Sequence, residues 1–505
     1  MKITLKIGFV LSILALLGSS CGLITPSSGT TSTTTSATTS PMVEITFKVD
    51  IPQNTPENDD IYLSVVDEVK GLAHEAQNYA MEKTTDENIY QVTLSLPLHT
   101  VLKYRYARQS ASVLEHTSAN VPVRYRMYHV TGPGEARDII SQWVDMAQDQ
   151  ATGQISGTIT DQATGQGVPG ILISAGGIQT FTTANGGFLL PGLPPGVQNL
   201  VAYAPNGTYH TEQQGAQVAA QSNTLAELTL TPAKMVDITF IVSVPPDTPR
   251  GQVRLAGNLY QLGNTFGNLP GGASVMPERA PKLISAGGNQ YGIILSLPAG
   301  AEVRYKYTLG DGFWNAEHTP KGNFHIRRLI VPDAATQIRD HVETWQAGTQ
   351  GPVTFNLEVP SYTPPGESVS VQFNANGWSV PQPMWKADAN HWTYTLYSPL
   401  NLFSKFSYRY CREGKCGLAD DSRTMGNSTS GWMLESPSQP LIIEDRVDGW
   451  GWLEESLPQA PSLIADIQPK TSSFVAGLEL MPNASPARPG QLATALSEIV
   501  SLNAN

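Results

Sequence analysis

Three stretches of the chain alternate apolar and polar residues with a period of two, which is the pattern of a β-strand with one buried face. The apolar positions are Ile45, Phe47, Val49 and Ile51, then Ile238, Phe240, Val242 and Val244, then Val353, Phe355, Leu357 and Val359. Each stretch runs into a Pro-x-x-Thr-Pro motif, at residues 52–56, 245–249 and 360–364. Proline cannot donate to a strand ladder and favours a turn, so each strand is predicted to end there.

Two further landmarks follow in the same order. A later strand, predicted at 90–96, 291–297 and 394–398, is followed by an alternation of tyrosine and basic residues: LKYRY from Leu102, VRYKY from Val303 and FSYRY from Phe406. Each segment then closes on Asp-x-(Ile or Val)-x-x-Trp, at residues 138–143, 340–345 and 445–450. Four landmarks in one order, three times, predict an internal repeat of roughly a hundred residues, the size of a β-sandwich.

The period of two also predicts which side chains face the core. Val303, Tyr305, Tyr307 and Leu309 fall on one face of their strand, and Arg304 and Lys306 fall on the other. We therefore predict that the repeated tyrosines pack inward. We also predict that the closing residues Trp143, Trp345 and Trp450 pack against the core and close the end of each sandwich, and that they do not contact sugar.

A fourth unit lies between the first and second repeats. Its glycine-rich turns, Gly157-Thr-Ile-Thr-Asp161 and FTTANGGFLLPGLPPG from Phe181, resemble the carboxypeptidase regulatory-like domain, a small β-sandwich that serves as a spacer. Nothing in the unit offers a nucleophile beside a base, so the family name does not indicate peptidase activity.

The predicted fold class is all-β, with tandem sandwiches of immunoglobulin-like or starch-binding-like type. The predicted sandwiches span residues 42–147, 153–232, 235–347 and 352–455. Residues 456–505 are predicted to be a linker plus an incomplete βα unit, with a strand at 474–481 and a helix at 490–502 that would begin an α/β barrel. The alternative is a terminal helix packed on the last sandwich.

Composition agrees with this organisation. The chain has 505 residues, too many for one core, and only 15% are charged, while 45 glycines and 37 prolines suit turn-rich β structure. The net charge of -12 argues against a nucleic-acid partner.

The N-terminus predicts export. Lys2 and Lys6 precede an apolar run, residues 7–17, that has the length of a signal-peptide core and is too short to span a bilayer. The signal peptide is assigned to residues 1–21, because the ending LLGSSC resembles a bacterial lipoprotein signal and implies lipidation of Cys21 and anchoring to a membrane. Plain secretion is the alternative. Residues 22–41 are predicted to be a Ser/Thr-rich linker.

The other two cysteines, Cys411 and Cys416, are five positions apart, which in an oxidising compartment favours a disulfide across a short hairpin. A metal site is less favoured because no histidine or second cysteine pair stands nearby.

The second repeat resembles the starch-binding modules of carbohydrate-binding family 20. The resemblance rests on VRLAGNLYQLGN (residues 253–264), VRYKY, and Trp314 followed by Glu317. It implies that stacked aromatic rings bind an α-glucan while polar side chains bond its hydroxyls, which makes Trp314, Glu317 and Lys306 the candidate binding residues.

The sequence departs from the family pattern at several positions. Thr265 stands where the family has a second stacking tryptophan, so Tyr260 or Phe266 would have to substitute. The first repeat has Val113 or Leu114 at the hairpin position of Trp314. In the third repeat a separate platform is predicted from Trp378, Trp385 and Trp392, with a core role for at least one of them.

No catalytic constellation is found within residues 42–455, and no cofactor is predicted. Glu115-His116 and Glu317-His318 are interpreted as hairpin contacts, and Asp420, Asp421 and Asn427 as a surface turn rather than a calcium site. We therefore expect an exported carbohydrate-binding protein that recognises starch-like α-glucans. One alternative is that the chain holds the non-catalytic modules of a truncated cell-surface glycoside hydrolase, whose catalytic domain is expected to follow residue 505. The other is a structural stalk or adhesin.

Overall fold

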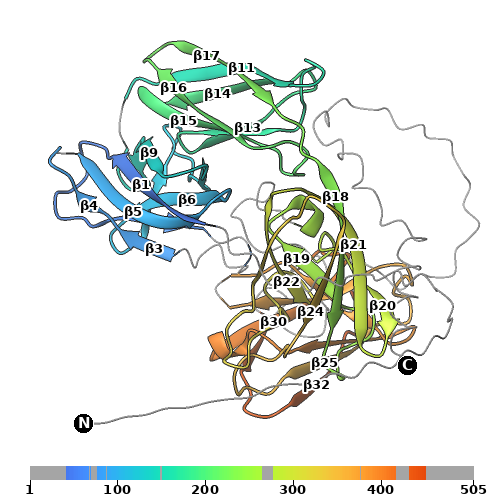
Figure 1. Cartoon of the computed structure of the whole chain (residues 1–505). Coiled ribbons are helices and arrows are strands. Elements are labelled where there is room, and N and C mark those ends of the chain that lie inside the picture. Colours follow the sequence, from blue (N-terminus) through green and yellow to red (C-terminus); the bar gives the residue numbers. More distant parts are fainter. Residues whose placement is uncertain are drawn as a thin grey trace, which may run out of the picture. The chain divides into compact units, whose positions relative to one another are not determined.

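The computed structural model of the chain describes residues 41–450, apart from residues 67–68, 70–76, 87, 148–149, 264–276, 376 and 417–430. The described residues form strands and two short 3-10 helices, which build four sandwich units (Figure 1). We call them repeat 1 (42–147), the intervening unit (153–232), repeat 2 (235–347) and repeat 3 (352–450, the described part of the predicted 352–455). The all-β prediction is confirmed, and the predicted βα unit at 456–505 lies outside the described residues.

The strands of repeat 1 and of the intervening unit form four sheets. Repeat 1 contains β1 (Met42–Asp50), β2 (Ile61–Val65), β3 (Gln77–Ala80), β4 (Glu82–Lys83), β5 (Ile89–Pro97), β6 (Val101–Arg108), β7 (Val113–His116), β8 (Arg126–His129), β9 (Gly134–Ile139) and β10 (Gln142–Trp143). The intervening unit contains β11 (Gly153–Asp161), β12 (Leu172–Ala175), β13 (Ile178–Phe181), β14 (Gly187–Leu193), β15 (Gly196–Tyr203), β16 (Glu212–Val218) and β17 (Asn223–Leu230).

The two later repeats have the same plan. Repeat 2 contains β18 (Met235–Ser243), β19 (Arg254–Gly257), η1 (Tyr260–Leu262), β20 (Ile284–Gly287), β21 (Gln290–Pro298), β22 (Glu302–Thr308), β23 (Arg327–Ile330) and β24 (Thr336–His341). Repeat 3 contains β25 (Val353–Glu358), β26 (Val369–Asn374), β27 (Gln382–Pro383), β28 (Trp385–Lys386), β29 (His391–Leu396), η2 (Leu400–Leu402), β30 (Lys405–Arg412), β31 (Trp432–Glu435) and β32 (Leu441–Arg446).

Each unit is built around its first strand. In repeat 1, β1 pairs antiparallel with β5 and parallel with β9, the strand that carries Asp138 of the closing motif. The strands β11, β18 and β25 take the same central place in their own units, and all four are labelled in Figure 1. The alternating apolar residues of the first strands are buried as predicted, with Phe47, Phe240 and Phe355 fully enclosed in three separate cores.

The repeated tyrosines share one acceptor, the aspartate of the closing motif. In repeat 1, the hydroxyls of Tyr104 and Tyr106 both donate to Asp138 Oδ2, at 2.7 and 2.8 Å. Repeat 2 has the same arrangement at Asp340 and repeat 3 has it at Asp445. Burial and the neighbouring carboxylate raise the pKa of Tyr106 well above its ordinary value, so its hydroxyl stays a donor. The tyrosine alternation therefore serves hydrogen bonding as well as packing.

The closing tryptophan is bonded to the proline-flanked turn. The indole Nε1 of Trp143 donates to Thr55 Oγ1 at 2.8 Å, and Trp345 and Trp450 make the same bond to Thr248 and Thr363. All three tryptophans are buried, as predicted. The Pro-x-x-Thr-Pro motif thus supplies, besides the turn, the threonine that joins the start of each repeat to its end.

Candidate functional site

Trp314, on which the predicted glycan site depends, is buried. Its side chain is 2% exposed and belongs to the core of repeat 3 instead of the core of its own repeat. The ring centroid lies 4.7 Å from that of Phe373 and 5.7 Å from that of Phe403, and Nε1 donates to Ser379 Oγ at 3.0 Å. The expectation that this indole faces solvent is wrong, because the neighbouring sandwich covers the hairpin that carries it.

Residues 311–316, which we call the docking hairpin, are shaped to fit repeat 3. Asp311 Oδ1 accepts the backbone N–H groups two and three residues further on, at 2.7 and 2.6 Å, and so fixes the turn. Asn315 then bridges the two repeats. Its amide donates to the carbonyl oxygen of Thr395 at 2.7 Å, and its Oδ1 accepts the N–H of Tyr397 at 2.7 Å. The hairpin is therefore bonded to repeat 3 by polar groups as well as by the indole.

Glu317 contacts protein groups instead of solvent. It is fully buried, its Oε1 accepts the N–H of Tyr307 at 2.7 Å, and it forms an ion pair with Arg327. Burial raises the pKa of Glu317 to about 7, although Arg327 opposes the shift. In repeat 1, Glu115 is equally buried and makes the matching bond to the N–H of Tyr106. The interpretation of these glutamates as hairpin contacts agrees with this geometry.

Lys306 is also enclosed. It lies on the strand face opposite the tyrosines, as predicted, yet it is fully buried, with Nζ 4.4 Å from the ring centroid of Phe324. A cation at this distance is attracted to the ring face. None of the three residues that the family resemblance proposed is therefore at the surface.

Tyr260 and Phe266 were the two candidates to replace the second stacking tryptophan of the family. Tyr260, in η1, is half-buried, and its N–H donates to the carbonyl of Pro205 in the intervening unit at 3.3 Å. Phe266 lies outside the described residues.

The three tryptophans of repeat 3 do not share one environment. Trp392 is 8% exposed and lies in the core, which fits the predicted core role for one of them. Trp385 is half-buried and packs on Tyr394, with 5.2 Å between ring centroids. Trp378 is half-buried beneath the guanidinium of Arg409, which lies 3.8 Å from its ring centroid.

One exposed tryptophan was missed. Trp432 is 44% exposed and its neighbour Met433 is 65% exposed. Trp432 lies opposite Tyr408 in the ladder, at the register position that Arg126 and Arg327 occupy in repeats 1 and 2. Aligning the strand before each closing motif would have shown this exchange of arginine for tryptophan.

Repeat 1 also docks on its neighbour. The outer edge of β8 is covered by amide side chains of the intervening unit: Gln179 donates to the carbonyl of Tyr125 and Asn199 to that of Met127, both at 3.0 Å. Tyr125 and Met127 also join a small core with Leu172 of the intervening unit. Covering an edge strand in this way prevents its pairing with other chains.

The remaining predicted sites divide into two groups. Cys411 and Cys416 form a disulfide, as predicted. Cys21, Asp420, Asp421 and Asn427 lie outside the described residues. Within the described ranges, no group of three or more His, Cys, Asp or Glu side chains is arranged to hold a metal ion, and no helix is long and apolar enough to cross a membrane.

Comparison with known proteins identifies one part of the chain. Residues 154–231 match the carboxypeptidase regulatory-like domain family, which confirms the prediction for the intervening unit. No curated protein matches the chain. The resemblance of the repeats to starch-binding modules stays a prediction.

Several solved structures share local likeness. The Bacillus anthracis TIE protein is 11% identical, with a TM-score of 0.17, 81% of this chain covered and 69% of that one. A streptococcal ancillary pilin is 12% identical, with a TM-score of 0.23 and coverage of 59% and 99%. The shaft pilin SpaA of Lactobacillus rhamnosus GG is 11% identical, with a TM-score of 0.14 and coverage of 38% and 99%. Scores this far below 0.5 support no functional inference.

Proposed function

We propose that the chain is an exported, non-catalytic scaffold protein whose β-sandwiches dock on one another and serve as a structural stalk. The observation that carries this proposal is the burial of Trp314 in the core of repeat 3. In starch-binding modules the corresponding hairpin would present an aromatic ring to the glycan. In this chain the docking hairpin contacts the neighbouring repeat instead.

The energetics favour docking over exposure. An indole buries about 150–250 Å². At roughly 25 cal/mol per Å², this amounts to about 4–6 kcal/mol, which is an upper estimate because unfolded chains already bury some surface. The indole N–H and the Asn315 amide also have partners in repeat 3. Moving the docking hairpin away from repeat 3 to expose Trp314 to a sugar would break these hydrogen bonds and expose the indole to water.

Affinity electrophoresis on amylose, pullulan, cellulose and chitin tests the proposal. The scaffold function predicts that the mature protein migrates equally in gels with and without each polysaccharide. Retardation by amylose that is lost in Trp314→Ala but kept in Trp450→Ala, a matched control at an equally buried tryptophan outside the predicted glycan sites, would contradict it.

Glycan contact through repeat 3 is a second candidate, favoured by the exposed ring of Trp432. The backbone beside it, at Gly431, lies against Trp378, because a Cβ added to that glycine would be 2.6 Å from the Trp378 ring. Two neighbouring indoles could cover the apolar face of a sugar. Retardation that disappears in Trp432→Ala but persists in Trp314→Ala would assign binding to this surface.

We further propose that the protein is exported and anchored through a lipid on Cys21. Support comes from the signal-like N-terminus and from the Cys411–Cys416 disulfide, a bond that persists in oxidising compartments. Cys21→Ser should move the protein from the membrane fraction to the soluble exported fraction. Unchanged membrane association of this variant would overturn the anchor.

A further inference from the structure

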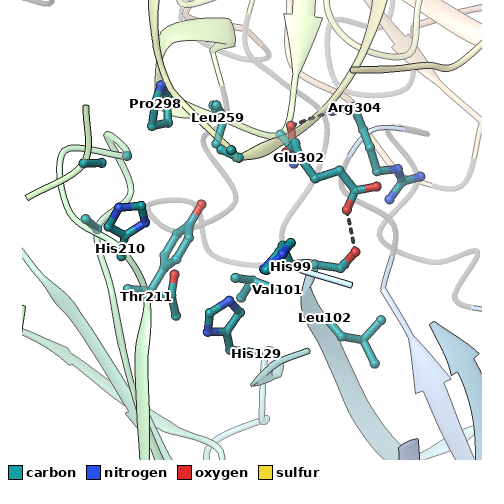
Figure 2. Close-up of a pocket in the computed structure, with 18 of the residues that line it drawn as sticks. His99, Val101, Leu102, His129, His210, Thr211, Leu259, Pro298, Glu302 and Arg304 are labelled. Carbon is teal, nitrogen blue, oxygen red and sulfur yellow. Dashed lines mark hydrogen bonds between the residues drawn. The ribbon is translucent and has the colours of Figure 1, made fainter. Parts of the chain in front are cut away.

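A cavity of about 450 Å³ lies where repeat 1, the intervening unit and repeat 2 meet (Figure 2). Thr100 of repeat 1 donates to Glu302 Oε2 of repeat 2 at 2.5 Å at one side of it. At another side, Gly207 of the intervening unit lies so close to Pro298 that an added Cβ would be 2.6 Å from it. The cavity has the size of a small-molecule site, for which roughly 300–1,000 Å³ is typical.

The charged and titratable side chains of the cavity wall are mainly basic. Lys103, Arg304 and three histidines line it. The one acidic side chain among the described lining residues is Glu302, which is held by Thr100 and paired with Arg328. This wall belongs to a chain whose net charge is -12, so general surface composition does not account for it.

The three histidines come from two units, and, besides burial, two of them lower the pKa of the third. His99 and His129 belong to repeat 1 and His210 to the intervening unit, and Figure 2 shows all three around the same space. Burial lowers the pKa of His129 to about 4, and the positive charges of His99 and His210 contribute to the shift. Near neutral pH the His129 ring is neutral and offers a ring N–H as a hydrogen-bond donor. Lys103 and Arg304, which line the same wall, supply the positive charge that would attract an acidic group.

Most of the remaining wall is apolar, apart from neutral polar residues such as Asn258 and Thr211. Val66 and Val101 of repeat 1 and Leu259, Ala299 and Ile330 of repeat 2 line it. A ligand that fits both parts has an apolar body and a single charged end, because pockets of this kind use few polar groups to orient a largely apolar ligand.

We infer that this cavity binds a small organic anion, with an apolar body against Leu259 and its neighbours and an acidic group among His99, His129 and His210. The inference is independent of glycan binding and adds a ligand site to the scaffold. Because the wall comes from three units, such a ligand would also hold the three together.

A series of three naphthalene probes of matched shape tests the charge preference by isothermal titration of the mature protein. We expect 1-naphthoate to bind with a stoichiometry of one and at least tenfold more tightly than 1-naphthylmethylammonium, with 1-naphthylmethanol between them. Equal affinity for the three probes, tighter binding of the cation, or no saturable binding of naphthoate would overturn the inference.

Variants locate the site. The double substitution His99→Gln and His210→Gln should weaken naphthoate binding at least fivefold, because both rings lie at the exposed side of the cavity. His391→Gln is the matched control, since His391 is an exposed histidine of repeat 3 and is not part of the cavity wall. Unchanged affinity in the double variant, or an equal loss in the control, would contradict the site. Glycan gels run on the same proteins test the scaffold function separately.

Discussion

Replacing Trp314 with alanine removes an indole that repeat 2 contributes to the core of repeat 3. The residue is 2% exposed, and truncation of a buried tryptophan typically costs about 3–5 kcal/mol, which includes the cavity left behind. The lost hydrogen bond to Ser379 adds about 1 kcal/mol. We therefore expect Trp314→Ala to lower the free energy of unfolding by about 4–6 kcal/mol.

The strands that lose hydrogen-exchange protection in Trp314→Ala provide a more specific test than the free energy of unfolding. Hydrogen exchange followed by mass spectrometry should show lost protection in β26 and β30 of repeat 3, while β1 of repeat 1 is unchanged. Trp378→Ala is the matched control, because this half-buried ring lies beneath the guanidinium of Arg409 and is not part of the core cluster of repeat 3, so its loss should cost about 1 kcal/mol. A loss below about 1 kcal/mol for Trp314→Ala, or exchange confined to repeat 2, would refute the docking account.

Three further predictions concern the repeated bonds and pH. Asp138→Asn should lower the free energy of unfolding, measured by urea titration, by about 3–5 kcal/mol, because it leaves the buried Arg126 without one of its carboxylates. Asp445→Asn should cost less, because repeat 3 has Trp432 at the position of that arginine. Equal losses for the two variants would contradict this prediction. Thr363→Val should cost about 1–3 kcal/mol by leaving the indole N–H of Trp450 buried without its acceptor, and a neutral effect would show that the bond is dispensable. The pKa of His129 is lowered in the folded protein to about 4, so its contribution to stability is present above pH 6.5 and is lost as pH falls toward 4; His129→Gln should flatten this part of the stability profile, and an unchanged profile would exclude His129 as its cause.

The sequence was sufficient for the framework of each repeat. Alternation with a period of two gave the first strands, and proline gave their ends, because both are local properties of the backbone. The partnership of Tyr104 with Asp138 was not visible, although both motifs were, because the bond joins residues on different strands. The repetition of both motifs in one order was the available clue.

The site could not be predicted in the same way. Strand alternation assigns Lys306 to a face, and a hairpin position was assigned to Trp314, but neither indicates whether a second sandwich covers that face. The prediction for Trp314 failed because the covering residues, such as Phe373, come from another repeat. Burial by a neighbouring domain depends on the packing of whole units, which local periodicity does not encode.

Oxidative footprinting of tryptophan side chains tests the central claim most directly. The mature protein would be exposed briefly to hydroxyl radicals, and the oxidation rate of each tryptophan would be measured by mass spectrometry. The docking account predicts that Trp314 is oxidised many times more slowly than Trp432 and about as slowly as the core residue Trp450. Oxidation of Trp314 at the rate of Trp432 would show that the indole is open to solvent and would contradict the account.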